Sequence, residues 1–274
     1  MEFQRKKYKE FAIKQLSGRW KTAVLCALIM TVVSFVFSIP RMNLTYSWEE
    51  IKAISNLSLQ ELWNYLANKG SQSITQDLLT LIEELITLIL DIAAAQLFLA
   101  YSRSPEPVSL KVFFEGLNKW GRGILTGLWQ GLWLFLWIAA CALLGVIIEI
   151  PFAMIAPESD TIIGIFTIII LIFVCVIAII KSIEYSHHML LVAEFPELGI
   201  RKALRISILI TKGHRMDIFI TELSFIPLEL FGLITLGIGF LWVGPFMRMT
   251  RINIYHALLK DALETQKLHP EDLN

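Results

Sequence analysis

Basic stretches with a helical period alternate with long apolar runs along this chain, and the alternation occurs three times. The three basic stretches, each followed at once by an apolar run, are residues 6–21, 111–122 and 201–215. A helix rises about 1.5 Å per residue, so about 20 apolar residues cross the ~30 Å hydrocarbon core of a bilayer. The pattern therefore predicts an integral membrane protein in which each basic stretch leads into a transmembrane helix.

Six segments are predicted to span the membrane, namely residues 22–39, 78–100, 124–148, 161–180, 218–236 and 240–258. The sixth is unusual for a span because it contains Arg248 and Arg251. Lys and Arg are frequent before the first span and in the connections after the second and fourth, and they are sparse in the other connections. The positive-inside rule then places both termini in the cytoplasm, which requires an even number of spans and supports the sixth.

The basic stretches are themselves predicted to be amphipathic helices. Leu110, Phe113, Phe114 and Leu117 recur at i, i+3, i+4 and i+7, with Lys111 on the opposite face. Helices of this kind lie in the membrane interface and direct their basic face toward lipid headgroups. We expect anionic headgroups as partners of an interfacial basic surface formed by Lys111, Lys119, Arg122, Arg201, Arg205, Lys212 and Arg215.

The predicted fold class is all-α and integral to the membrane, with six transmembrane helices as three hairpins, each preceded by a cytoplasmic amphipathic helix. Gly18, Gly121 and Gly213 each precede a span beside an arginine and are roughly 100 residues apart, which suggests repeats at 1–100, 101–180 and 181–260. Any pattern of basic flank plus span would produce part of this similarity. We expect residues 1–274 to form a single membrane domain that ends in a short polar tail at 261–274. Residues 48–67 are predicted to form a short external helix.

Composition supports the membrane class. Hydrophobic residues make up 55% of the chain and charged residues 18%, against about 45–50% and about 25% in soluble domains. The net charge is zero and the basic clusters lie beside predicted spans, so nucleic-acid binding is not expected. Cys26, Cys141 and Cys175 all lie in apolar runs, where packing is expected rather than a disulfide framework or a zinc site.

Ionisable residues inside predicted spans are functional candidates, because each costs about 2.5–3.5 kcal/mol at a helix centre. One hypothesis is an acid–base cluster in which Asp91 or Glu229 pairs with Arg248 or Arg251 and lines a polar cavity or a proton or substrate path. The alternative is a structural ion-pair network that joins the repeats, with Arg251 reaching toward the cytoplasm. The candidate cluster comprises Glu84, Asp91, Glu222, Glu229, Arg248 and Arg251.

Two further motifs have a structural and a functional interpretation. Glu184, His187 and His188 form E-x-x-H-H, and Glu and His at i, i+3 share a helix face as in carboxylate-bridged metal sites. A di-metal site needs a second E-x-x-H, which the sequence lacks, so we expect no metal and no other cofactor. Pro227 is predicted to kink the fifth span near Glu222 and Glu229, an arrangement also typical of transporter sites.

Motifs in the last third of the chain resemble those of a known family. They fall on Tyr185, Glu194 with Pro196, Ala203 with Ser207, Gly213, Leu223-Ser224-Phe225, Gly237-Ile238-Gly239, Pro245, Thr250 and Tyr255. From Ile180 onward the chain resembles the uncharacterised bacterial multi-pass membrane family called domain of unknown function 975. It departs from that pattern at Thr211, Pro227, Phe246 and Ile254. The resemblance implies a bacterial plasma-membrane location and no established activity.

No catalytic motif is evident, since neither a Gly-rich phosphate loop nor G-x-S-x-G occurs. We therefore expect a non-enzymatic membrane protein that organises or handles lipids or amphipathic molecules. The alternative is a small secondary transporter or channel that uses the intramembrane Asp, Glu and Arg residues. An intramembrane enzyme is the third and weakest of the hypotheses.

Overall fold

The computed structural model describes residues 3–38, 52, 60–61, 74–155 and 160–273, and this part of the chain contains helices and no strands. The all-α prediction is confirmed, whereas the external helix predicted at 48–67 lies almost wholly outside the described residues. Two short 3-10 turns lie at Leu117–Lys119 and Pro270–Leu273. The α-helices are α1 (Arg5–Leu16), α2 (Trp20–Ser38), α5 (Ile74–Arg103), α6 (Lys111–Gly116), α7 (Trp120–Ile155), α8 (Asp160–Tyr185), α9 (His188–Glu194), α10 (Ile200–Thr211), α11 (Arg215–Leu223), α12 (Ile226–Ile234) and α13 (Phe240–Glu264).

Three helical segments within these ranges are long and apolar enough to cross a membrane, whereas the sequence suggested six. They are Trp20–Phe37, Lys111–Ile148 and Gly164–Glu194. The fifth predicted span is divided, since α11 and α12 have only 9 residues each, too few for a ~30 Å core. The second and sixth lie in α5 and α13, whose apolar side chains are largely buried against other helices. By length and composition the described helices thus support three spans, and the count of six stays a prediction.

Helix α5 forms the centre of the core. Ile92, Ala94 and Leu97 are fully buried, and α5 packs against α2, α6, α7, α9 and α13. Helix α7 approaches α5 closely at Gly123, where an added Cβ would lie only 2.9 Å from the carbonyl oxygen of Leu88. Small residues thus bring the backbones of α5 and α7 together, as small residues do where helices pack closely in membranes.

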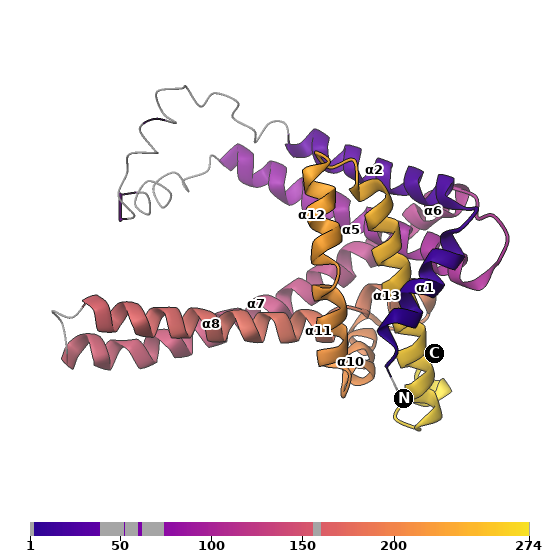
Figure 1. The fold of residues 1–274 in the computed structure, drawn as a ribbon. Coiled ribbons are helices and arrows are strands. Elements are labelled where there is room, and N and C mark those ends of the chain that lie inside the picture. Colours follow the sequence, from indigo (N-terminus) through magenta and orange to yellow (C-terminus); the bar gives the residue numbers. More distant parts are fainter. Residues whose placement is uncertain (1–2, 39–51, 53–59, 62–73, 156–159, 274) are drawn as a thin grey trace.

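Helices α7 and α8 extend side by side away from the remaining helices (Figure 1). Their apolar side chains remain exposed, including Phe135 at 66% and Leu171 at 61%. Soluble monomers rarely leave apolar surface of this extent uncovered. Near the base of the pair, the guanidinium of Arg201 lies over the Trp129 ring at 4.8 Å and so joins α10 to α7.

The predicted short helices before the apolar runs are present as α1, α6 and α10. Gly18 and Gly213 have φ values of +75° and +95°, the left-handed region that favours glycine. Gly121 does not form such a turn, because it lies in the first turn of α7 after a 3-10 segment. The threefold repeat remains a prediction, with two of its three turns alike.

Candidate functional site

Two ion pairs join α13 to its neighbours. The Nη2 atom of Arg248 donates to Oδ1 of Asp91 on α5 at 2.7 Å. One turn further along α13, Arg251 forms a two-point hydrogen bond with Glu222 of α11, from Nε at 2.8 Å and from Nη2 at 2.7 Å. The four side chains are between 33% and 41% exposed, so both pairs remain accessible at the protein surface.

The other two carboxylates of the candidate cluster are not hydrogen-bonded to either arginine. Glu84 on α5 and Glu229 on α12 are both exposed, and neither forms a hydrogen bond or ion pair with the residues described. In a continuous helix Glu222 and Glu229 would share a face, two turns apart. The interruption between α11 and α12 separates them, so Arg251 binds Glu222 alone.

A cavity of about 410 Å³ opens beside the two arginines, between α5, α7, α9 and α13. Its polar lining includes Asp91, Arg248, Arg251 and Gln130. Gly131 of α7 also lines it, and a Cβ at that position would meet no atom within 4 Å. Ligand pockets typically measure about 300–1,000 Å³ and combine apolar walls with a few polar groups. The apolar walls are formed mainly by Leu88, Ala94, Ala95, Phe98, Leu134, Met189, Leu190 and Ile252.

Glu184 holds three elements together at the end of α8. Its side chain is only 3% exposed and accepts hydrogen bonds from Lys181 Nζ at 2.9 Å and Arg215 Nη2 at 2.7 Å. Its backbone carbonyl accepts a further hydrogen bond from Ser207 Oγ at 2.7 Å. Glu184 thus links α8 to α10 and α11 and is committed to two cations.

The two histidines of the E-x-x-H-H motif have different surroundings from Glu184. His188 Nε2 lies 2.9 Å from the carbonyl oxygen of Ile200, and the His187 ring packs against Tyr255 with the centroids 5.8 Å apart. His187 is 2% exposed, and neither of its ring nitrogens has a hydrogen-bond partner within the described part of the chain. Among the described residues no group of three potential ligands could hold a metal ion.

A polar cluster around Glu194 was missed as a candidate site by sequence reasoning. The carboxylate accepts hydrogen bonds from Arg103 of α5 and from the Tyr255 hydroxyl of α13, each at 2.5 Å. His256 Nε2 lies 3.8 Å from the same carboxylate. Glu194 and Tyr255 both belong to the motifs that resemble the known family, and this shared membership was the signal that could have identified the cluster. The cluster joins α5, α9 and α13.

Some residues of the predicted basic surface are exposed, whereas others are bound to partners within the protein. Arg122 Nη2 donates to the carbonyl oxygen of Leu198 at 2.8 Å, and Arg215 is bound to Glu184. Lys119 is partly buried in the 3-10 turn that precedes α7. The exposed members are Lys111, Arg201, Arg205 and Lys212.

Arg122 and Arg19 have equivalent structural roles. Arg19, which follows Gly18, donates from Nη1 to the carbonyl oxygens of Ser104 at 2.6 Å and Glu106 at 3.0 Å. Each arginine thus ties the start of one long helix to a connection that is distant in sequence.

Comparison with known proteins extends the resemblance seen in the last third of the sequence. No curated protein and no solved structure matches the chain. A family described as "protein of unknown function (DUF975)" matches residues 1–262. Because this match covers almost the whole chain, the protein belongs to the DUF975 family.

Proposed function

We propose that this protein is a multi-pass protein of the bacterial plasma membrane that binds a lipid or a similar amphipathic molecule without chemically transforming it. The observation that carries this proposal is the cavity of about 410 Å³, in which two guanidinium groups adjoin apolar walls. An amphipathic ligand would place its polar head at Arg248 and Arg251 and its apolar part along α5 and α7.

The membrane arrangement that we propose has six spans and both termini in the cytoplasm. The three long apolar helical segments support a location in the bilayer. Glu84 and Glu229 form no ion pair among the described residues, but if α5, α11–α12 and α13 cross as well, the Asp91–Arg248 and Glu222–Arg251 pairs compensate four of their charges. Charged residues within membranes are typically paired with one another in this way.

The charge of the cavity favours certain headgroups over others. A guanidinium has five N–H donors; Arg248 uses one of them for Asp91, and Arg251 uses two for Glu222. The remaining donors are available to a phosphate or carboxylate without breakage of either pair. Because the two pairs are neutral together, we expect a zwitterionic or singly charged headgroup rather than a polyanion.

Gly131→Leu tests this function because it adds an apolar side chain to the lining of the cavity. An added Cβ at this position meets no atom within 4 Å, and leucine is favoured over glycine in a helix by up to about 1 kcal/mol. We expect the amount of lipid that co-purifies with the full-length protein, measured by mass spectrometry per mole of protein, to fall at least fivefold. The thermal unfolding midpoint should not fall.

Gly164→Leu is the matched control. Gly164 is a helical glycine of α8, likewise with no atom within 4 Å of an added Cβ, and it does not line this cavity. Its co-purified lipid should equal that of the unaltered protein. Equal lipid content in both variants would contradict binding in the cavity.

A second function, a small secondary transporter, rests on the interrupted helix. Pro227 lies at the start of α12, directly after the break, and the exposed Glu229 forms no ion pair with the residues described. Pro has no N–H to donate, so it favours the start of a helix over its interior. Discontinuous helices with nearby ionisable groups form the ion and substrate sites of many transporters.

For this second function, proteoliposomes under an imposed membrane potential should conduct protons faster than empty liposomes, as followed by an internal pH-sensitive dye. Asp91→Asn and Glu229→Gln should each lower the rate at least tenfold while protein content stays unchanged. Glu115→Gln, which alters an exposed carboxylate of α6, should leave the rate within twofold. A wild-type rate equal to that of empty liposomes would exclude proton coupling.

A further inference from the structure

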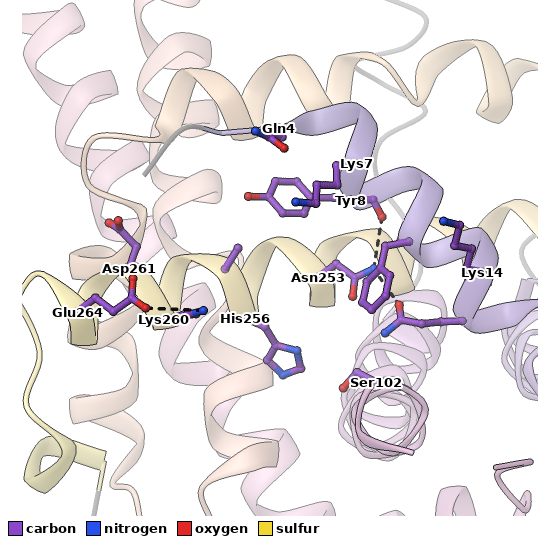
Figure 2. A pocket seen from close by; sticks show the side chains of 13 residues that line it. Gln4, Lys7, Tyr8, Lys14, Ser102, Asn253, His256, Lys260, Asp261 and Glu264 are labelled. Carbon is purple, nitrogen blue, oxygen red and sulfur yellow. Dashed lines mark hydrogen bonds and ion pairs between the residues drawn. The ribbon is translucent and has the colours of Figure 1, made fainter. Parts of the chain in front are cut away.

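A second hollow, of about 790 Å³, lies between α1 and α13 (Figure 2). Its lining shares no residue with that of the cavity at Arg248. Helix α1 contributes Lys7, Tyr8 and Lys14 to its lining, and α13 contributes Asn253 and Lys260. The residues of α13 that line this hollow all follow Ile252, whereas those of the first cavity end there.

Helix α1 is a fixed wall of this hollow. Asn253 Nδ2 donates to Gln15 Oε1 at 2.9 Å and to the carbonyl oxygen of Tyr8 at 3.3 Å. Lys9 Nζ donates to Ser224 Oγ at 2.6 Å, beside the break between α11 and α12. These contacts, at Tyr8, Lys9 and Gln15, hold α1 and thus Lys7 and Lys14 in place relative to α13.

The lysines of the hollow outnumber the carboxylates that oppose them. Neither Lys7 nor Lys14 forms a hydrogen bond or ion pair with the residues that the structure describes. Both lining carboxylates have cationic partners. Glu264 pairs with Lys260 at 3.6 Å, and Asp261 lies 3.8 Å from Lys267 Nζ and 4.0 Å from His214 Nε2. The ammonium groups of Lys7 and Lys14 are therefore available to an external anion.

A smaller hollow of about 380 Å³ continues the first around α1. The two share Phe11, Lys14, Gln15 and Ser102 in their linings, and the smaller one adds Arg19 and Arg103. We call the two hollows together the α1 groove. Phe11 is 52% exposed, so the groove also offers apolar surface next to its cations.

The Tyr8 side chain also lines the α1 groove. Burial raises the pKa of Tyr8 above its ordinary value. A hydrogen bond with the backbone of Gln4 lowers this pKa, whereas the carboxylates of Asp217 and Asp261 raise it further. The hydroxyl therefore remains protonated at neutral pH.

We propose that the α1 groove binds a phosphate-bearing anion through Lys7 and Lys14. Ammonium groups bind phosphate as point charges that adapt to its position. The anion is either the headgroup of an acidic phospholipid, with its acyl chains beside Phe11, or a free phosphate compound. The inference uses residues other than those of the proposed function, so each can fail without the other.

The test uses the full-length protein in neutral detergent with two probes, phosphatidylglycerol in mixed micelles and inorganic phosphate. Apparent Kd values follow from the dependence of the thermal unfolding midpoint on probe concentration. We expect at least one probe to stabilise the protein, and the double variant Lys7→Gln/Lys14→Gln to raise its Kd at least tenfold. Stabilisation by phosphatidylglycerol alone identifies a lipid headgroup, and stabilisation by inorganic phosphate identifies the anion itself.

Two further variants make the result specific to the α1 groove. Lys6→Gln/Lys21→Gln removes two exposed lysines that do not line either hollow, and it should change the Kd less than twofold. Lys7→Arg/Lys14→Arg keeps both charges and should bind within threefold of the unaltered protein. Absence of stabilisation by both probes, or equal losses in the two glutamine variants, would overturn the proposal.

Discussion

Glu184→Gln is expected to lower the free energy of unfolding by about 3 kcal/mol. Its carboxylate is 3% exposed and hydrogen-bonded to Lys181 and Arg215, so loss of its charge leaves two cations together without their counter-ion. Breakage of a buried pair by removal of one partner usually costs about 3–5 kcal/mol, and partial exposure of the cations places this case at the lower end. Denaturant titration of the purified protein in micelles measures the loss.

The double variant Glu184→Gln/Arg215→Gln separates charge compensation from packing. It should be more stable than the sum of the single losses predicts, because the uncompensated cation is removed as well. Glu115→Gln, at an exposed i, i+4 pair with Lys111, should change stability by no more than about 0.5 kcal/mol. A loss below about 1 kcal/mol for Glu184→Gln would show that the buried carboxylate does not hold α8, α10 and α11 together.

Gly123→Leu is expected to cost about 3 kcal/mol or to prevent α7 from docking on α5. The new Cβ would lie 2.7 Å from Ile92 Cγ2 and 2.9 Å from the backbone oxygen of Leu88. A backbone atom in the central helix cannot move aside as the end of a flexible side chain can. The helices must therefore separate, which would also alter the cavity near Arg248.

Gly121→Leu provides the matched comparison two residues away in the same helix. An added Cβ there meets nothing within 4 Å, so the substitution should be neutral or stabilise by up to about 1 kcal/mol. Denaturant titration of both variants, with co-purified lipid as a second measurement, checks the pair. Equal stability of the two variants would show that the contact of α7 with α5 does not depend on glycine.

The helices could be predicted from the sequence where long apolar runs contain no charge. The predicted spans 22–39, 124–148 and 161–180 fall almost entirely within α2, α7 and α8. In the fifth predicted span Pro227 correctly signalled an irregularity. The break lies before this proline, between Leu223 and Ile226, because Pro227 is accommodated in the first turn of α12.

The ionisable residues of the candidate site could be listed from the sequence, but only some of their partners could be predicted. The pair of Asp91 with Arg248 was among the expected combinations, and it joins residues 157 positions apart. Glu229 was the alternative acid in that prediction, and the two-point partner of Arg251 is instead Glu222. The E-x-x-H-H spacing indicated a shared face, whereas Glu184 binds two cations and His188 a backbone carbonyl.

The sequence by itself determined the helical class, the long apolar helices and the short basic helices before them, because these depend on the periodicity and polarity of consecutive residues. Only the tertiary structure decided which carboxylate meets which arginine, where a cavity remains, and which lysines have no partner among the described residues. Those features depend on contacts between distant segments, such as the hydrogen bond between Gln15 and Asn253, 238 positions apart, that holds α1 against α13. Such contacts follow from how whole helices pack, which no local pattern encodes.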